Sequence, residues 1–402
     1  MDTTADTTGS GDAQSCLLVT GGFGFVMSHV IKAWLDGGHG KCIVLDLPGR
    51  LDEAVRVFLG PAAVAAAAAN AAAEGGDAAG DDAGGAGGGG CSSSSDGLLH
   101  YVAGSVTDAG TWARVGALGA RVTHIVHAAA VTPTAAEEAS FPARVLEVNL
   151  LGSVAALDFA RSLPGGQLRR FIYTSSDGVF NAPGLARGYP AAAAPAAAAA
   201  ATAVPAASSL YPISKYAMEK VVERYAELFP AALGGGVLLT VRFSDVWGPM
   251  DRDTGARNRH NEPHRVMRAV LDGARPVYYR GELDDAVADS VYAPDVASAM
   301  LLLLLAPPQS RPRQALYNIT MGGCPTLRQF LGAMGAAVLE GAVPAAEGAV
   351  PDMSTLPADH HLRMEPYNLP SAPLEEEFGW TRTPLPEACA QYLAWVRETN
   401  IA

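Results

Sequence analysis

The sequence has few cysteines, few basic residues and no long apolar run, and each shortage excludes a class of protein. Its five cysteines form no CxxC pair and their number is odd, so neither a disulfide scaffold nor a zinc ribbon is expected. Lysine and arginine together number 28 against 41 aspartates and glutamates, a net charge of −13. This charge argues against nucleic acid and anionic membranes as partners.

No targeting or membrane segment is visible in the sequence. The first 15 residues, MDTTADTTGSGDAQS, contain neither an apolar stretch nor an arginine, unlike a secretory signal or a transit peptide. The longest apolar run, around residues 301–305, is closed by Pro307 and Pro308 and is too short to span a bilayer, so it predicts a buried helix end. With its unpaired cysteines, the chain is expected to be a soluble cytoplasmic protein.

Short apolar runs alternate with helical patterns along most of the chain. The runs lie at residues 16–20, 41–47, 98–102, 123–128, 170–174 and 237–242. The clearest helical patterns lie at residues 25–35, 145–162 and 214–227. This alternation predicts βαβ units with right-handed connections. We therefore expect an α/β fold with a Rossmann-type doubly wound parallel sheet and a smaller C-terminal substrate lobe.

The predicted organisation has a disordered tail and two main parts. Residues 1–14 form the tail, residues 15–250 a dinucleotide-binding domain, and residues 251–402 mainly a substrate-binding lobe with segments that return to the first domain. Two low-complexity tracts, at residues 61–96 and 190–209, interrupt the dinucleotide-binding domain. The first is rich in alanine, glycine and serine and is expected to be disordered, and both are interpreted as insertions in surface loops.

A glycine-rich turn follows the first predicted strand, in the segment TGGFGFVMSH. Gly21 and Gly24 allow a tight turn and let the backbone approach a pyrophosphate at the N-terminus of the next helix. Asp46 ends the second predicted strand, 22 residues after Gly24. A carboxylate there accepts hydrogen bonds from the ribose hydroxyls and repels a 2′-phosphate, which predicts NAD as the cofactor. Arg50, close by, is the residue that would weaken this preference over NADP.

Three further residues suggest a proton-transfer site. Tyr211 and Lys215 are four residues apart at the start of a predicted helix, so both side chains lie on one face. A free phenol has a pKa of about 10, and a neighbouring ammonium lowers it toward the working range. Ser176 follows the fifth predicted strand at the edge of the sheet where ligands bind, and its hydroxyl can hold a substrate oxygen.

Together these motifs resemble those of the extended short-chain dehydrogenase/reductase family, which contains sugar-nucleotide epimerases and 3β-hydroxysteroid dehydrogenases. TGGFGFVMSH is similar to the family's TGGxGFIGSH, and the resemblance continues through VHAAA, VNLLGS, YTSSDGVF, YPISK, VRFSDVWGP and YNIT. It implies that catalysis rests on Ser176, Tyr211 and Lys215. It also implies that NAD is bound by Gly21, Gly24, Phe25, Val26, Asp46, Ala128, Ala129, Tyr211 and Lys215.

Two departures from the family pattern bear on the cofactor. Met27 stands where the family has its third glycine, and its side chain would crowd the helix–strand contact or the pyrophosphate. Ser105 stands where the family usually has an aspartate near the adenine. The resemblance implies that Asn149 fixes backbone near the site, and a residue that caps a turn is the alternative. It also places His127 near the cofactor, but a hydrogen-bonded core histidine is the preferred interpretation.

The substrate positions separate the chemistries within the family. Asp177 is followed by Gly178, so the Asp-Glu pair of the dehydratases is missing. Asp245 replaces the asparagine that nucleotide-sugar enzymes usually place against the substrate, and its charge would repel a diphosphate. The segment AVADSVYA lacks the arginine that such enzymes commonly use as a diphosphate clamp. Arg257 and Arg259, in a basic loop at residues 251–265, either clamp an acidic substrate or form a solvated surface.

The main prediction is an NAD-dependent oxidoreductase that interconverts a secondary alcohol and a ketone on a small sugar-like substrate, acidic if the basic loop binds it. An NAD-dependent sugar or nucleotide-sugar epimerase and a non-catalytic dinucleotide-binding sensor remain as alternatives. No metal is expected, since the pair His360 and His361 has no further ligands at metal-binding spacing. The expected partner is a small-molecule substrate. The sequence does not decide between a monomer and a homodimer.

Overall fold

The computed structural model describes residues 15–66, 98–118, 121–180, 209–252, 262–272, 289–307, 311–323, 325–335 and 369–401. Several of the predicted features lie outside these residues: the tail at 1–14, residues 67–96 of the first tract, the second tract up to residue 208, Arg257, Arg259, and the histidine pair at 360–361.

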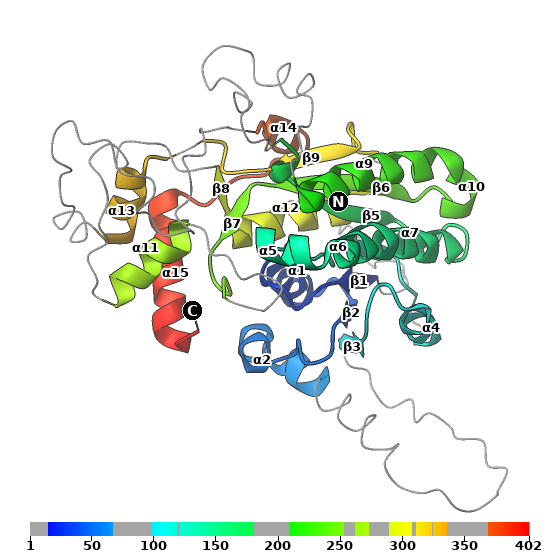
Figure 1. Cartoon of the computed structure of the whole chain (residues 1–402), viewed down its shortest axis with the longest axis horizontal. Coiled ribbons are helices and arrows are strands. Elements are labelled where there is room, and N and C mark those ends of the chain that lie inside the picture. The colour runs from blue at the N-terminus through cyan, green and yellow to red at the C-terminus, as the bar shows by residue number, and fades with distance from the viewer. Residues whose placement is uncertain are drawn as a thin grey trace, which may run out of the picture.

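A seven-stranded parallel sheet forms the centre of the described molecule (Figure 1). Its strands are β1 (Cys16–Thr20), β2 (Lys41–Asp46), β3 (Leu99–Ala103), β4 (His124–His127), β5 (Arg170–Ser176), β6 (Val237–Phe243) and β9 (Leu316–Ile319). They are arranged in the order β3-β2-β1-β4-β5-β6-β9, so the chain winds outward in both directions from β1. This topology confirms the predicted doubly wound Rossmann-type sheet.

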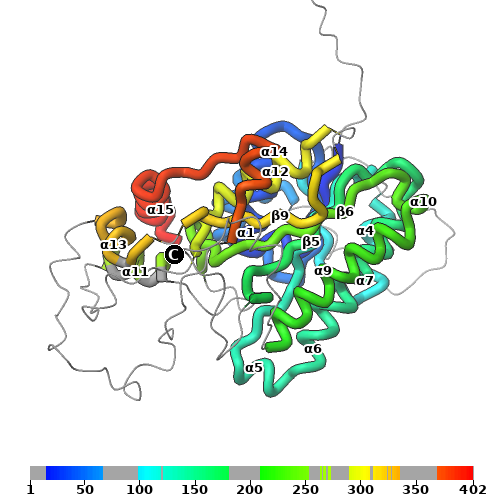
Figure 2. The backbone as a smooth tube through the Cα atoms, turned by 90° about the horizontal axis from the view of Figure 1, so that it is seen from above, coloured from blue at the N-terminus to red at the C-terminus, as the bar shows by residue number. Residues whose placement is uncertain are grey.

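Helices cover both faces of the sheet, as continuous apolar strands require. One face packs against α1 (Phe25–Asp36), α2 (Glu53–Leu59) and α12 (Ala293–Leu305). The other packs against α4 (Ala109–Ala117), α7 (Gly152–Ser162) and α9 (Leu210–Leu228). In Figure 2, α9 and α7 lie together on the side of the sheet away from α12. Residues of β1 alternate between the two layers, with Leu17 facing the first and Leu18 the second.

A smaller lobe lies to one side of the sheet. Strands β7 (Asp245–Trp247) and β8 (Ser290–Tyr292) pair in parallel, and α11 (Glu262–Leu271), α13 (Leu327–Gly335) and α15 (Leu385–Thr399) lie beside them (Figure 1). Trp247, Phe330 and Tyr392 are at the centre of a separate apolar cluster in this lobe. Strand β9, helix α12 and helix α14 (Ala372–Phe378) return to the main sheet. The domain boundary after residue 250 stays a prediction.

The first six residues of the first low-complexity tract are ordered and packed. The prediction that this tract is disordered is therefore wrong for these residues. Residues 61–66 are helical, and Ala63 and Ala66 are buried in the cluster that contains α2. Alanine has the highest helix propensity and its small side chain fits a close contact, so an alanine-rich segment next to α2 can extend the packed layer. The remainder of the tract lies outside the described residues.

Two predicted helices differ from the structure in detail. Helix α9 begins at Leu210, four residues before the helical pattern at residues 214–227, and Tyr211 lies in its first turn, as expected for the Tyr211–Lys215 pair. The predicted helix at residues 145–162 is divided into α6 (Pro142–Leu146), the π-helical segment η2 (Glu147–Leu151) and α7. Such π segments often mark functional positions, and η2 carries Asn149.

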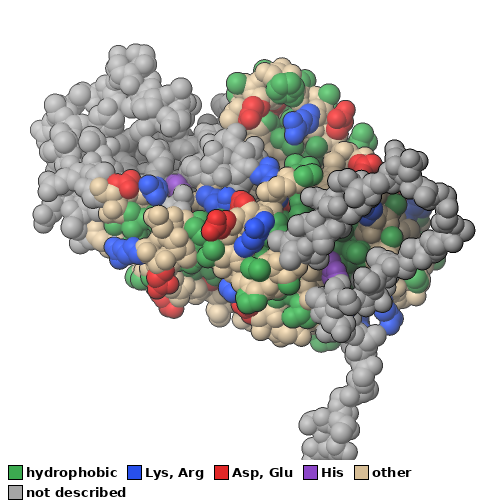
Figure 3. Space-filling model, turned by 90° about the horizontal axis from the view of Figure 1, so that it is seen from below, with side chains coloured by type: hydrophobic (Ala, Val, Ile, Leu, Met, Phe, Trp, Pro, Cys, Tyr) green, Lys and Arg blue, Asp and Glu red, His purple; other side chains and the backbone are tan. Residues whose placement is uncertain are grey.

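The apolar run at residues 301–305 is the end of a buried helix, as predicted. Leu303 and Leu304 of α12 are fully covered, while Leu305 is exposed. No helix among the described residues is long and apolar enough to cross a membrane. On the face shown in Figure 3, acidic and basic side chains of the described residues are interspersed with apolar ones.

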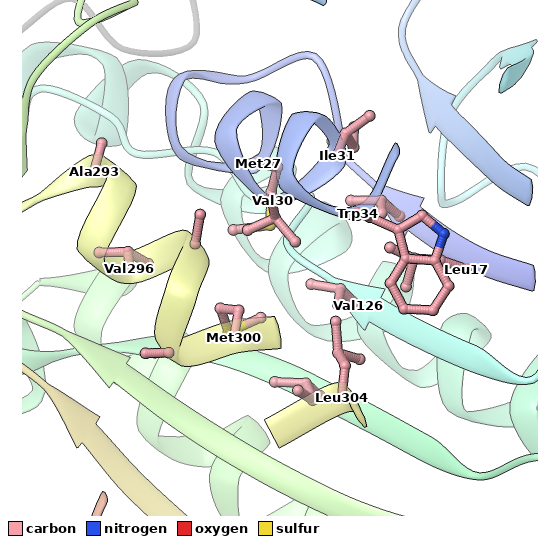
Figure 4. Packing of buried hydrophobic residues seen from close by; sticks show 14 of the residues in the cluster. Leu17, Met27, Val30, Ile31, Trp34, Val126, Ala293, Val296, Met300 and Leu304 are labelled. Atoms are coloured by element: carbon pink, nitrogen blue, oxygen red, sulfur yellow. The ribbon is translucent and has the colours of Figure 1, made fainter. Parts of the chain in front are cut away.

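The side chain of Met27, which stands where the family has its third glycine, is part of the hydrophobic core. Its side chain is buried in the apolar cluster between α1 and α12. Figure 4 shows Met27 and Val30 of α1 directed toward α12, which contributes Val296 and Met300 to the same cluster. The side chain that replaces the family's third glycine therefore packs between the two helices. Met27 also borders the cavity at the carboxyl edge of the sheet, so its predicted crowding of a pyrophosphate stays a prediction.

We expect Met27→Ala to lower the free energy of unfolding by about 2–5 kcal/mol, because it leaves a cavity between α1 and α12. Denaturant unfolding followed by circular dichroism measures this change. The control is Val57→Ala in α2, at a side chain that is 52% exposed, which should change stability by at most about 0.5 kcal/mol. Equal stability of the Met27→Ala variant and the parent would contradict the core role of this side chain.

Candidate active site

A cavity of about 700 Å³ lies along the carboxyl edge of the main sheet. Its walls come from the ends of β1, β2, β3, β4 and β5, the start of α1 and the start of α9. Open α/β sheets bind ligands at this edge, where the strand order reverses. All of the predicted cofactor residues line the cavity: Gly21, Gly24, Phe25, Val26, Asp46, Ala128, Ala129, Tyr211 and Lys215.

The glycine-rich turn approaches the loop after β4 closely. Gly21 has a φ of +65°, and a Cβ there would lie 2.9 Å from the backbone N and Cα of Ala129. The hydroxyl of Thr20 accepts hydrogen bonds from the amides of Ala128 and Ala129, both at 3.2 Å. A side chain at Gly21 would therefore be strained and would collide with backbone.

Helix α1 points its N-terminus into this cavity. Gly24 is its N-cap, and it makes no side-chain capping hydrogen bond. The amides at a helix N-terminus, together with the helix dipole, favour an anionic group such as a pyrophosphate. Gly21 and Gly24 both line the cavity at this end of the helix.

Asp46 lies at the end of β2 with both carboxylate oxygens hydrogen-bonded to backbone. Oδ2 accepts from the amide of Phe23 at 2.9 Å, and Oδ1 accepts from the amide of Leu47 at 2.8 Å. Burial raises the pKa of this carboxyl, and the two hydrogen bonds and the nearby Arg50 charge act in the opposite direction. These bonds fix the carboxylate at the cavity wall, where it retains lone pairs for further donors.

The loop after β3 also lines the cavity. Ser105 lines the cavity, and its hydroxyl is hydrogen-bonded to the hydroxyl of Thr107 at 2.8 Å. The cavity volume, the glycine cradle, the open helix N-terminus and the fixed carboxylate together fit a dinucleotide.

Tyr211 and Lys215 lie together at the other end of the cavity. The Lys215 ammonium donates a hydrogen bond to the carbonyl oxygen of Thr174 at 2.8 Å. It lies 5.7 Å from the ring centroid of Tyr211 and 5.1 Å from that of Tyr173. Burial lowers the pKa of Lys215 to about 7, and the carboxylate of Glu219 partly offsets this effect. The ammonium is therefore close to the phenol that it is predicted to activate.

The first turn of α9 is held by residues from neighbouring elements. Ser214 donates to the carbonyl oxygen of Tyr211 at 2.7 Å, and Asn149 donates to the Ser214 hydroxyl at 3.1 Å. Asn149 also binds both the amide and the carbonyl of Val131, at 2.8 and 3.0 Å. Asn149 thus fixes backbone near the site, the first of its two interpretations. The carboxylate of Glu138 accepts a bond from the amide of Leu210 at 3.1 Å.

Ser176 ends β5, as the sequence predicts, but its hydroxyl is engaged with the following turn. It donates to Asp177 Oδ1 at 3.2 Å and accepts from the amide of Gly178 at 3.0 Å. Of the described residues at this strand end, Thr174 and Ser175 line the cavity and Ser176 does not. Asp177, the first residue of η3 (Asp177–Phe180), is buried.

The predicted substrate residues lie apart from the cavity or outside the described residues. Asp245 is exposed at the start of β7, and it is not among the residues that line the cavity. In the basic loop, Arg252 forms an ion pair with Asp52 at 2.7 Å, and His264 is buried beside the Tyr392 hydroxyl. These two basic residues therefore have structural partners, and the roles of Asp177, Asp245, Arg257 and Arg259 stay predictions.

His127 is a core histidine, as expected. Its ring nitrogens contact the hydroxyls of Thr20 and Ser153, both at 2.8 Å. Burial lowers its pKa to about 3, and the charge of Lys215 acts in the same direction. Among the described residues, no three histidine, cysteine or carboxylate side chains gather as metal ligands.

Sequence reasoning missed a buried ion pair behind the site. Glu219 accepts from Arg242 through both oxygens, at 2.8 and 2.6 Å, and from the Ser175 hydroxyl at 2.5 Å. The four-residue spacing from Lys215 to Glu219 places both side chains on one face of α9, but it does not indicate the pairing of Glu219 with Arg242.

The comparisons with known proteins give one family and many similar folds. The family model described as the NAD dependent epimerase/dehydratase family matches residues 17–320. No curated protein matches the sequence significantly. Among solved structures, the Bordetella bronchiseptica enzyme WbmG in complex with NAD is 20% identical with a TM-score of 0.62, covering 97% of this chain and 96% of that one.

Two further solved structures are named as epimerases. UDP-glucose-4-epimerase from Stenotrophomonas maltophila, with bound NAD and formylated UDP-arabinopyranose, is 17% identical with a TM-score of 0.64, covering 96% of this chain and 99% of that one. UDP-glucuronic acid 4-epimerase from Bacillus cereus, in complex with UDP-glucuronic acid and NAD, is 14% identical with a TM-score of 0.60, covering 95% and 99%. At these identities the likeness shows the fold.

The family model spans well over half of the chain and includes the glycine turn, the end of β5 and the start of α9. The fold, the position of the cavity and the family match agree with the resemblance found in the sequence. The chain belongs to the NAD dependent epimerase/dehydratase family, whose members are NAD-dependent enzymes.

Proposed function

We propose that the protein is an NAD-dependent sugar epimerase, which oxidises a secondary hydroxyl and then reduces the resulting ketone on its other face. The observation that carries the proposal is the presence of Tyr211 and Lys215 in the same cavity as the glycine turn and Asp46. The epimerases among the similar structures favour this alternative over the dehydrogenase that the sequence placed first.

The glycine turn, the N-terminus of α1 and Asp46 would hold the dinucleotide, with Tyr211 and Lys215 at its nicotinamide end. When bound, the oxidised cofactor would take up a hydride from a carbon that carries a hydroxyl, and the reduced cofactor so formed would deliver a hydride to a ketone. The protein supplies the binding energy, the orientation of the substrate and the path of the proton.

The proton path begins at the Tyr211 phenol. In the oxidation half-reaction, the phenolate removes the proton of the substrate hydroxyl, and in the reduction the phenol returns it. The Lys215 ammonium stabilises the phenolate through its charge, since an opposite charge nearby favours the ionised form. Ser176 would orient the substrate oxygen by turning its hydroxyl away from Asp177.

A dehydrogenase that releases NADH is the second candidate, and Asp245 favours it. This carboxylate is exposed where nucleotide-sugar enzymes usually have an asparagine, and it would repel a diphosphate if ionised. The segment AVADSVYA also carries no arginine for a diphosphate. A sugar without a nucleotide would then be the substrate, acidic if Arg257 and Arg259 bind it.

Product analysis of the purified full chain separates these functions. UDP-glucose, UDP-glucuronic acid and a panel of sugar acids and alcohols are incubated with NAD, and epimers are measured by chromatography while NADH is followed by absorbance. Epimer formation without accumulation of NADH supports the epimerase. Accumulation of NADH and ketone without an epimer supports the dehydrogenase, and NAD binding without any product supports the sensor.

We expect the wild-type chain to bind NAD at least about 10-fold more tightly than NADP, a difference of roughly 1.4 kcal/mol, because Asp46 repels the 2′-phosphate. Asp46→Ala should reduce the difference between the affinities for NAD and NADP. Titration calorimetry with both dinucleotides measures it, and Asp36→Ala, at an exposed ion pair with Lys32 on α1, is the control. Equal affinity of the wild type for NAD and NADP would contradict the role of Asp46.

We expect Tyr211→Phe to lower the turnover number about 100-fold or more, because the hydroxyl that transfers the proton is lost. The affinity for NAD should stay nearly unchanged. Lys215→Met should reduce both turnover and NAD affinity, since the family resemblance places this ammonium at the nicotinamide ribose. Steady-state kinetics and NAD titration measure the two effects. Equal loss of NAD binding in both variants would indicate misfolding and contradict the separate roles.

A further inference from the structure

Glu219 is a buried carboxylate behind the catalytic pair. It lies two helical turns after Tyr211 and one turn after Lys215 on α9, and its side chain is 1% exposed. Its partners come from two adjacent strands: Ser175 on β5 and Arg242 on β6. The carboxylate thus connects the catalytic helix to the strand end that forms the cavity wall.

Glu219 accepts three hydrogen bonds from two residues. Arg242 binds both carboxylate oxygens through Nε and a terminal nitrogen, and the Ser175 hydroxyl adds a third hydrogen bond. The Arg242 guanidinium also lies 4.8 Å from the ring centroid of Phe180 in η3. Buried ion pairs often contribute little net stability relative to apolar replacements. We therefore considered a role for this pair in the adjacent site.

Lys215 depends on its surroundings to remain charged. Among the described residues it forms no ion pair, and its one hydrogen-bond acceptor is the neutral carbonyl of Thr174. A buried ammonium with neutral neighbours loses its proton readily. Lys215 donates to Thr174, and Glu219 accepts from the next residue, Ser175, so adjacent residues of β5 hold the two side chains on one face of α9. This placement makes Glu219 the carboxylate whose charge favours the protonated form of Lys215.

Resting on the proposed function, we propose that Glu219 is a positioning residue, whose carboxylate, fixed by Arg242 and Ser175, keeps the Lys215 ammonium charged beneath the Tyr211 phenol. Arg242 and Ser175 hold the carboxylate in one orientation, and they hold β5 at a fixed distance from α9. Glu219 acts through Lys215 and does not touch the substrate.

Other titratable groups surround the ammonium and contribute to its environment. Those that face it or its partners from the packed elements are Tyr211 and Glu219 on α9, Tyr173 on β5, His127 on β4 and Arg242 on β6. His127 is neutral near pH 7, because burial lowers its pKa to about 3. Of these groups, Glu219 carries the negative charge that favours the ammonium, and the positive charge of its partner Arg242 acts in the opposite direction.

The direct test is a lysine NMR titration, which the sequence makes simple. The chain has only four lysines, Lys32, Lys41, Lys215 and Lys220, so selective ¹⁵N labelling of lysine gives few signals. Glu219→Gln keeps the shape and removes the charge, so the Lys215 midpoint should move down by about one pH unit. The matched control is Glu223→Gln, one turn further along α9, where Glu223 forms an exposed pair with Lys220. An unchanged Lys215 midpoint in Glu219→Gln would overturn the proposal.

Kinetics give a second readout that a purely structural role would not change. The fall of kcat at alkaline pH should begin about one pH unit lower in Glu219→Gln than in the wild type, because the ammonium is lost at lower pH. The KM for the substrate should stay within about twofold, since Glu219 does not contact it. An unshifted alkaline limb with a lower kcat at every pH would overturn the proposal.

A double variant covers the case in which Glu219→Gln leaves Arg242 unpaired and the protein unstable. Glu219→Gln with Arg242→Met removes both buried charges and should fold. The Lys215 midpoint in this double variant should lie below that in Arg242→Met alone, which keeps the Glu219 carboxylate, and equal midpoints in these two variants would overturn the proposal. The titration needs no substrate, so it is informative even if the wild type turns over none of the sugars, a result that would refute the proposed function alone.

Discussion

The hydrogen bond from the Lys215 ammonium to the carbonyl of Thr174 is the contact on which the candidate site depends. A buried ammonium is costly unless nearby groups stabilise its charge. The Tyr173 and Tyr211 rings lie within 6 Å of it, and the Glu219 carboxylate lies one turn away on the same helix. These requirements fix α9 against the end of β5, and that placement brings the Tyr211 phenol to the cavity where the dinucleotide is expected.

The residues expected to bind the dinucleotide and those expected to transfer the proton come from different elements of the fold. The ends of β1 and β2 carry the glycine turn and Asp46, which fit the phosphate and ribose of a dinucleotide, while β5 and α9 carry the proton-transfer groups. Parallel strands place all these ends on one edge of the sheet. Hydrogen bonds between elements then adjust the geometry: Thr20 holds the loop after β4, and Asn149 holds the first turn of α9.

Local spacing made the strands, the glycine turn, Asp46 and the Tyr211–Lys215 pair predictable from the sequence. Contacts between distant residues were not predictable in this way. Arg242 and Glu219 lie on different elements, and Arg252 pairs with Asp52, which is 200 residues away in sequence. No local sequence pattern therefore predicts either ion pair. The orientation of the Ser176 hydroxyl depends on the turn that follows it. The side chain of Met27 found space between α1 and α12, a contact that depends on how two distant helices pack.

If the proposed function is correct, the cavity along the carboxyl edge of the sheet binds NAD beside Tyr211 and Lys215. A crystal structure of the full chain, soaked or co-crystallised with NAD, shows whether it does. We expect one NAD per chain, with its pyrophosphate at the N-terminus of α1, its adenine ribose at Asp46 and its nicotinamide end next to Tyr211. Density for NAD elsewhere, or none at saturating NAD, would contradict it.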